Sequence, residues 1–174
     1  LEKGIERLLT IWSHVVKKLP DATLLLIGGA GSYQKTIDQQ IAHYKLSPHV
    51  VCIGPIEHRK LLSSGLLSVL DVFVSTSTTE TFGLSMVESM AHGVPVVIPR
   101  TQGMKDVVGS AGLISSTDTE MADAIVRMFT NEPLRIQFGT KAQQVASRYS
   151  GEAGIDSYMT EFQKVIRKLK RRSR

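Results

Sequence analysis

The chain has 174 residues, of which 42% are hydrophobic and 21% are charged, as is typical of one globular domain with a sizeable core. Its apolar runs are broken well short of the about 20 residues that a transmembrane helix needs, and its first residues show no signal-peptide pattern. The net charge of +5 comes from the end of the chain, because residues 164–174 hold seven of the 21 Lys and Arg and no acid.

The chain begins at Leu1 without a methionine, so we expect it to be a piece of a longer protein. Its single cysteine, Cys52, lies in an apolar run and has no second cysteine to pair with. This favours a reducing, cytoplasmic environment.

Segments with helical periodicity alternate with short apolar runs along the chain. The predicted helices cover, in order, about 5–19, 33–44, 61–70, 83–93, 118–130, 133–147 and 153–170. The predicted strands cover about 23–29, 50–54, 71–76 and 94–99. The strands are apolar throughout, which is typical of a parallel sheet covered on both faces. We therefore predict an α/β fold with a doubly wound, Rossmann-like parallel sheet that binds ligands beyond the carboxyl ends of its strands.

The segment GAGSYQKT, residues 29–36, is close to a P-loop and to a dinucleotide fingerprint. Both motifs require a glycine where this chain has Gln34, and glutamine resists the turn that lets backbone amides wrap phosphates. After the next strand, Gly54 and Pro55 stand where a dinucleotide site would have an acid for the ribose. We interpret the segment as a tight turn between a strand and a helix.

Two further classes of enzyme are disfavoured by the residues present. Ser85 lies in half of a nucleophile elbow, GLSMV, but Val87 replaces the second glycine and would collide in so sharp a turn. The five histidines show no metal-ligand spacing, and the chain has no Asp-x-Asp pair to hold a divalent ion against a diphosphate. We therefore expect neither a hydrolase nor a metal site.

The stretch TETFGLSMVESMAHGVPVV, residues 79–97, places Glu80 in a loop after a strand and Glu88 about one turn inside the next helix. The amides and positive dipole end at the start of that helix favour an anionic or polar ligand group, and Gly83 lets a ligand approach the backbone. Glu80 can accept hydrogen bonds from sugar hydroxyls, and Glu88 can bind the vicinal hydroxyls of a ribose. In the alternative interpretation Glu80 is a helix cap and Glu88 is solvated, but the helix is apolar nearly all round.

With this stretch the chain resembles the carboxyl-terminal, nucleotide-sugar-binding half of retaining glycosyltransferases of the GT-B fold, specifically glycosyltransferase family 4. The matching segments follow one another in collinear order over essentially the whole chain. They are EKG at residues 2–4, LLLIGGAG, VVCIGPI, DVFVSTS, the stretch with the two glutamates, and TQGMKDVV followed by AGLI.

The resemblance implies a role for each matched residue. Lys3 would bind the diphosphate and stabilise it as the leaving group, and Glu80 would contact the transferred sugar, so these two are the candidate catalytic residues. The candidate donor-binding residues are Glu88 at the ribose, the segment of Phe82, Gly83 and Leu84 beside the sugar, and Gly54 and Ile56 at the border of the base. The family's usual arginine would precede Leu1, and Gln102-Gly103 replaces its usual double glycine, which bears on donor choice.

The resemblance also implies an activity for the whole enzyme. It would transfer a sugar from a nucleoside-diphosphate sugar to an acceptor with retention of configuration, without a metal or any other cofactor. The acceptor and a catalytic histidine belong to an amino-terminal half outside this sequence, so we expect these residues alone to bind a nucleotide without transferring a sugar. Two alternatives stay open: a non-catalytic nucleotide-binding module, and a nucleotide-sugar epimerase of the same architecture.

The end of the chain differs in character from the rest. We divide the chain into a nucleotide-sugar-binding domain, 1–152, and a C-terminal helix with a basic tail, 153–174. Residues 153–166 are expected to pack on the protein, and 167–174 to contact an anionic membrane surface. Nucleic acid is not expected as a partner, because no aromatic residues interleave with the basic run. These features predict a cytoplasmic protein that can bind peripherally at the inner face of the membrane.

Overall fold

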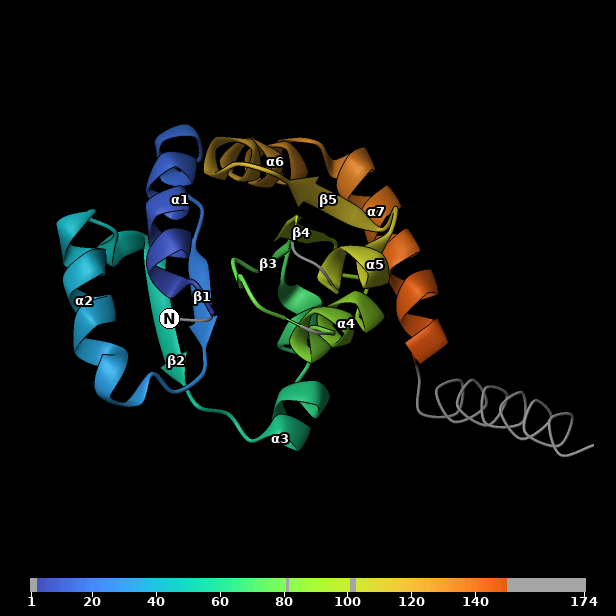
Figure 1. Cartoon of the computed structure of the whole chain (residues 1–174), viewed down its shortest axis with the longest axis horizontal. Coiled ribbons are helices and arrows are strands. Elements are labelled where there is room, and N and C mark those ends of the chain that lie inside the picture. Colours follow the sequence, from blue (N-terminus) through green and yellow to red (C-terminus); the bar gives the residue numbers. More distant parts are fainter. Residues whose placement is uncertain (1–2, 81, 101–102, 150–174) are drawn as a thin grey trace, which may run out of the picture.

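The computed structural model describes residues 3–80, 82–100 and 103–149, and Figure 1 shows their arrangement. The helices are α1 Ile5–Lys18, α2 Gln34–His43, α3 His58–Ser63, α4 Leu84–Ala91, α5 Met104–Val108, α6 Asp118–Thr130 and α7 Glu132–Ala146. The strands are β1 Leu24–Ile27, β2 Val50–Gly54, β3 Phe73–Val74, β4 Val96–Pro99 and β5 Gly112–Ser115. The helix expected at 153–170 and the basic tail lie outside the described residues.

All strand pairs are parallel, as predicted, and they form two ladders. One ladder has the order β1–β2, with Leu24 opposite Val50, and the other has the order β3–β4–β5, with Val97 between Val74 and Leu113. Within the described residues no strand pairing joins β1 to β3. The two ladders nevertheless share one hydrophobic core, because Leu24 and Val97 belong to the same cluster of buried side chains.

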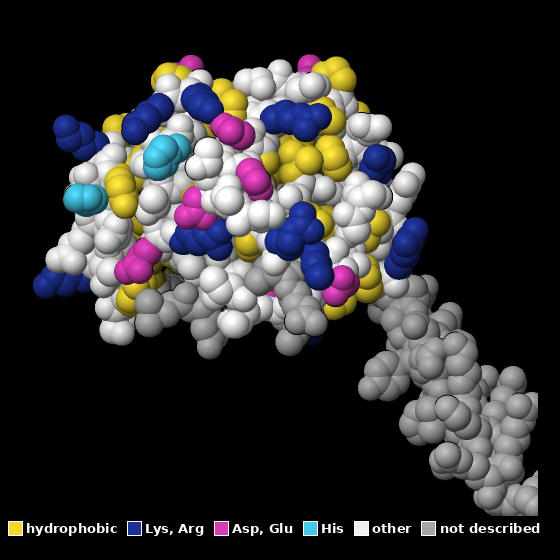
Figure 2. Space-filling model, turned by 45° about the horizontal axis from the view of Figure 1, so that its top comes forward, with side chains coloured by type: hydrophobic (Ala, Val, Ile, Leu, Met, Phe, Trp, Pro, Cys, Tyr) yellow, Lys and Arg dark blue, Asp and Glu magenta, His cyan; other side chains and the backbone are white. Residues whose placement is uncertain are grey.

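Charged side chains of both signs are interspersed over the face shown in Figure 2, with hydrophobic patches between them. Ion pairs connect elements on the surface: Lys18 of α1 contacts Asp123 of α6 at 2.7 Å, and Arg7 of α1 contacts Asp118 at 2.6 Å. The helices α1 and α6 are thus adjacent although more than a hundred residues separate these partners.

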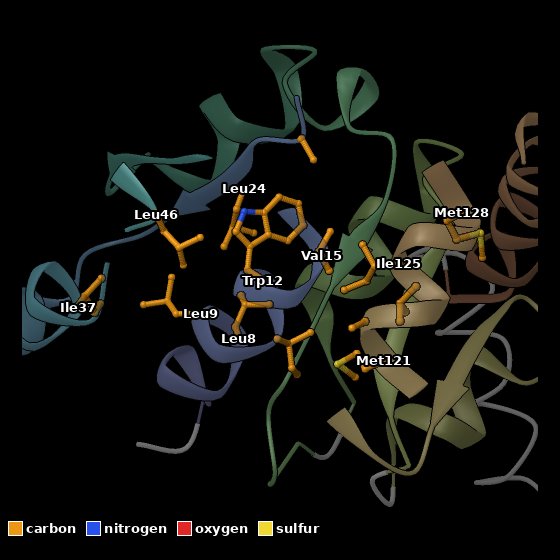
Figure 3. Close-up of a cluster of buried hydrophobic side chains, with 14 residues drawn as sticks. Leu8, Leu9, Trp12, Val15, Leu24, Ile37, Leu46, Met121, Ile125 and Met128 are labelled. Atoms are coloured by element: carbon orange, nitrogen blue, oxygen red, sulfur yellow. The ribbon is translucent and has the colours of Figure 1, made fainter. Parts of the chain in front are cut away.

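The first core lies under α1, α2 and α6 (Figure 3). Helix α1 contributes its entire apolar stripe, including Leu9 and Val15, neither of which is exposed, and Trp12 at 2% exposure. The Trp12 ring nitrogen donates a hydrogen bond to the carbonyl of His49 at 3.0 Å, which satisfies the only polar atom of this side chain. The amphipathic pattern of residues 5–19 therefore reports correctly which side of α1 is buried.

The second core lies under α4, α5 and α7 and is separated from the first by β4. Successive side chains of a strand point to opposite faces, and in β4 Val96 and Ile98 belong to the second core whereas Val97 belongs to the first. Helices therefore cover both faces of this ladder, and the doubly wound arrangement is confirmed. On β2 the expectation of two covered faces is wrong, because Val51 and Ile53 are 47% and 42% exposed.

Three elements differ from those expected, and one of them is strand β5, Gly112–Ser115, which was not predicted. Residues 61–70 were predicted as one helix, but α3 begins at His58 and ends at Ser63, and a short 3-10 turn follows at Leu67–Val69. Gly65 between them has a φ of +74°, which an α-helix does not allow, and Ser64 accepts a hydrogen bond from the amide of Leu66. Helix α5 was not predicted, because five residues are too few to show helical periodicity.

Helix α7 packs against the end of α4 through two glycines. A Cβ atom placed on Gly139 would lie 2.3 Å from the carbonyl oxygen of Gly93, which is closer than any side chain can approach. Gly93 itself has a φ of +79° and ends α4. The position of α4 therefore depends on the absence of a side chain at Gly139.

We expect Gly139→Ala to lower the free energy of unfolding by about 1–2 kcal/mol. The overpacking penalty of about 1–3 kcal/mol is partly offset by the better helix propensity of alanine. Urea unfolding followed by circular dichroism measures the change, and Gln144→Ala at an exposed position of the same helix is the matched control. A Gly139→Ala protein as stable as the wild type would show that α4 and α7 do not pack this closely.

Candidate functional site

The loops that leave the carboxyl ends of the strands come together at one edge of the fold. The amide of Gly28, after β1, donates to the carbonyl of Gly54 at the end of β2, at 2.9 Å. On the other ladder, Glu80 and Gly103 form a parallel bridge between the loops that follow β3 and β4. This is the edge at which doubly wound sheets bind their ligands.

Lys3 and Glu80, the two residues that the resemblance makes catalytic, are in direct contact. The Lys3 ammonium donates to Glu80 Oε2 at 2.8 Å, although the two residues are 77 positions apart. The Lys3 side chain is 72% exposed, whereas that of Glu80 is 22% exposed. The structure thus places a cation at the surface of the site and a carboxylate beneath it.

Thr76 holds the Lys3 segment against the end of β3. Its hydroxyl donates to the carbonyl of Gly4 at 2.8 Å and contacts that of Lys3 at 3.3 Å. Gly4 has a φ of +66°, and a Cβ atom there would lie 2.4 Å from the carbonyl oxygen of Thr76. Neither Thr76 nor Gly4 was predicted as a site residue, although a Ser/Thr run after a strand and a glycine before a helix were visible signals.

Helix α4 begins beside Glu80 without a side-chain cap. Gly83 is its N-cap residue, with a φ of 77° and a ψ of 59°, and no side chain among the described residues accepts from the first amides. Glu80 is therefore not a helix cap, and the start of α4 can present its amides to a ligand. The two neighbours of Gly83 lie in different surroundings. Phe82 packs on the second core and against Tyr149, with ring centroids 5.1 Å apart. Leu84, by contrast, is 67% exposed.

Glu88 lies one turn further along α4 and contacts a residue that the sequence did not single out. The ring nitrogen Nε2 of His58 donates to Glu88 Oε1 at 2.7 Å, and the Glu88 side chain is 21% exposed. The interpretation of Glu88 as a solvated helix residue is therefore wrong. His58 is the first residue of α3, and nothing about its sequence position indicated a partner 30 residues away.

Gly54 and Ile56, the residues predicted to border the base, lie in the loop between β2 and α3. Gly54 ends β2 with a φ of +82°, and Ile56 is half-buried two residues before His58. This loop therefore runs from the carboxyl edge of the first ladder to the His58–Glu88 contact on the second.

The described residues do not favour a cysteine nucleophile, a metal site or a membrane-spanning helix. The pKa of the Cys52 thiol is raised by partial burial and, to a smaller extent, by Asp38, which disfavours the thiolate that a nucleophile needs. Within residues 3–80, 82–100 and 103–149, no three His, Cys, Asp or Glu side chains form a group that could hold a metal ion. No helix in these ranges is both long and apolar enough to cross a membrane.

A hollow of about 360 Å³ lies between β5 and α6. Its two acidic residues already have partners, since Glu120 accepts from the amide of Ser116 and Asp123 pairs with Lys18. We therefore place the candidate site at the carboxyl edge rather than here.

Comparison with known proteins identifies relatives of the whole described region. The sequence model of the family "Glycosyl transferases group 1" matches residues 1–145. The N-acetyl-alpha-D-glucosaminyl L-malate synthase of Bacillus anthracis is 26% identical over 170 residues, which cover 95% of this chain and 43% of that protein. A D-inositol 3-phosphate glycosyltransferase of Corynebacterium urealyticum is 31% identical over 160 residues, which cover 86% of this chain and 37% of that protein.

Solved structures share the fold. A point mutant of S. aureus TarM, in a complex that includes UDP, has a TM-score of 0.81 and 27% identity, over 92% of this chain and 33% of TarM. HepE of Anabaena, in complex with UDP, has a TM-score of 0.79 and 25% identity, over 94% of this chain and 46% of HepE. The chain spans less than half the length of each of these four relatives. The match over residues 1–145 and the shared fold show that the chain belongs to the glycosyl transferases group 1 family.

Proposed function

We propose that this chain is the donor-binding part of a glycosyltransferase that takes its sugar from a nucleoside-diphosphate sugar. The observation that carries the proposal is the convergence of one cation and two carboxylates, Lys3, Glu80 and Glu88, around the start of α4. The complexes of TarM and HepE with UDP support it, because both proteins share this fold.

In this proposal the positive groups of the site bind the diphosphate. The Lys3 ammonium has three N–H donors, of which Glu80 takes one, so Lys3 can bind phosphate oxygens while it keeps this contact. The amides at the start of α4 add donors and the positive end of the helix dipole. Charge that develops on the departing diphosphate would be stabilised by groups already in place, which is the most effective form of electrostatic catalysis.

The two carboxylates would bind hydroxyl groups of the donor. Glu80 lies beside Lys3 and would accept hydrogen bonds from the transferred sugar, and Glu88 would accept them from the ribose. The loop with Gly54 and Ile56 leads to Glu88 through His58 and would lie beside the base. Metal-independence and retention of configuration are part of this proposal and rest on the resemblance to family 4.

We assign the acceptor site to a part of the protein outside this chain. The relatives are more than twice as long as the region they share with it, which leaves room for an acceptor domain. Contact of the basic tail at 167–174 with an anionic membrane stays a prediction, because the tail lies outside the described residues. A cytoplasmic location stays a prediction as well.

We expect Glu88→Gln to weaken the binding of UDP by about ten-fold or more. A hydrogen bond to a charged group contributes roughly 1.5–3 kcal/mol, and the amide keeps the shape of the side chain without its charge. Pyrophosphate, which has no ribose, should bind the variant as it binds the wild type. Calorimetry with both ligands measures the difference, with the exposed Glu132→Gln as the matched control. Unchanged UDP affinity in Glu88→Gln would remove Glu88 from the site.

We expect Lys3→Gln to weaken UDP and pyrophosphate alike, by about three- to ten-fold. This loss is smaller than the roughly 1.5–3 kcal/mol of a covered charged hydrogen bond, because Lys3 is exposed to solvent and its charge is screened. Lys18→Gln is the matched control, since Lys18 forms an ion pair of similar length with Asp123 away from the site. If only the control weakens binding, or if neither does, the diphosphate lies elsewhere.

We expect these 174 residues to bind UDP and to transfer no sugar by themselves. Positioning two reactants can account for roughly 7–11 kcal/mol of a barrier, and in our proposal this chain positions only the donor. Calorimetry with UDP, paired with an assay for the release of UDP from UDP-glucose in the presence of candidate acceptors, tests both parts. Efficient transfer would place the acceptor site within this chain. No binding of UDP, even at millimolar concentration, would favour a module that has the fold without the site.

A further inference from the structure

The contact between His58 and Glu88 joins two parts of the site that the chain does not connect locally. His58 begins α3 and Glu88 lies in the middle of α4, and the N–O distance of 2.7 Å is that of a short, charge-assisted hydrogen bond. The Glu88 side chain is mostly covered, whereas that of His58 is 65% exposed. The imidazole therefore reaches the carboxylate from the solvent side.

The geometry leaves the carboxylate free to bind a second group. A carboxylate has two oxygens with about four lone-pair positions. Among the described residues, His58 is the only hydrogen-bond partner of this carboxylate, and the contact uses Oε1. Glu88 Oε2 and the remaining position of Oε1 can accept from a vicinal diol while His58 stays in place. His58 and a ribose can thus donate hydrogen bonds to the Glu88 carboxylate at the same time.

We propose that His58 is a positioning residue that holds the Glu88 carboxylate in the orientation that binds the nucleoside. An unrestrained glutamate would lose rotamer freedom on binding a ligand, and the hydrogen bond from His58 removes that freedom beforehand. The inference rests on the proposed function, because it concerns the ribose-binding role of Glu88.

The position of His58 also links the loop at Gly54 and Ile56 to Glu88. His58 follows Ile56 by two residues, in the loop that begins at Gly54 and that the proposed function places beside the base. Any shift of this loop would move His58 and thereby Glu88. His58 therefore couples recognition of the base to recognition of the ribose, and its effect should be confined to ligands that contain a nucleoside.

The test compares UDP with pyrophosphate in His58→Ala, by calorimetry on the full chain. We expect UDP affinity to fall about three- to ten-fold and pyrophosphate affinity to stay within two-fold of the wild type. His58→Gln, whose amide N–H₂ can donate to the same oxygen, should recover most of the UDP affinity. His43→Ala is the matched control, because His43 is an exposed histidine at the end of α2.

A double variant separates positioning from a general effect on the fold. If His58 acts through Glu88, then His58→Ala should have little further effect on UDP binding in a Glu88→Gln background. Full UDP affinity in His58→Ala would overturn the inference, as would tighter binding, which would mean that His58 competes with the ligand. Equal losses for UDP and pyrophosphate would also overturn it, since they would report a disturbance of α3. A wild-type chain that binds pyrophosphate but not UDP, or neither ligand, would overturn the proposed function and this inference together.

Discussion

Strand β4 is buried on both of its faces, with Val97 in one core and Val96 and Ile98 in the other. Parallel strands are joined by crossovers that run over a face of the sheet, and because both faces of this strand are apolar and buried, helices cover it on both sides. The same rule brings the carboxyl ends of neighbouring strands to one edge. The loops that carry Glu80 and Gly103 meet there because β3 and β4 run in the same direction. The position of the candidate site is thus a consequence of how the hydrophobic core is built.

The charged residues of the site are held by contacts that contribute little to stability. Exposed ion pairs are typically worth less than about 1 kcal/mol, and Lys3 and His58 are both mostly exposed. Their acidic partners, Glu80 and Glu88, are mostly covered. Glu80 is held by the Lys3 ammonium and Glu88 by the His58 imidazole, each on the solvent side. A ligand therefore meets carboxylates that already have an orientation, and it can share their partners at small cost to the fold.

The backbone of the site depends on glycines at two helix starts. Gly83 and Gly103 are the N-cap residues of α4 and α5, and both have a positive φ, 77° and 93°. A side chain at either position would be strained, and at Gly83 it would also press on Met104 at 3.3 Å. Of the family's double glycine, this chain keeps the second, Gly103, which is the residue that pairs with Glu80.

The sequence by itself determined the local elements and the class of fold. Periodicity identified α1, α2, α4, α6 and α7, and the continuous apolar strands indicated a parallel, doubly wound sheet, because both patterns are set by neighbours a few residues apart. It also named Glu80 and Glu88 from their places beside and inside one helix start, and Lys3 through the resemblance, but it did not predict the contacts of these residues. The break at Gly65, the short α5 and the exposed face of β2 were missed, since each depends on surroundings that a local pattern does not contain.

Only the tertiary structure decided which residues meet. The partners in the Lys3–Glu80 and His58–Glu88 contacts are 77 and 30 positions apart, and Thr76 reaches Gly4 across 72. Such contacts depend on the order and direction of strands, which are settled when the whole core is buried at once. An exposed histidine such as His58 shows no hydrophobic pattern of its own, so its role became visible only when the fold placed it 2.7 Å from Glu88.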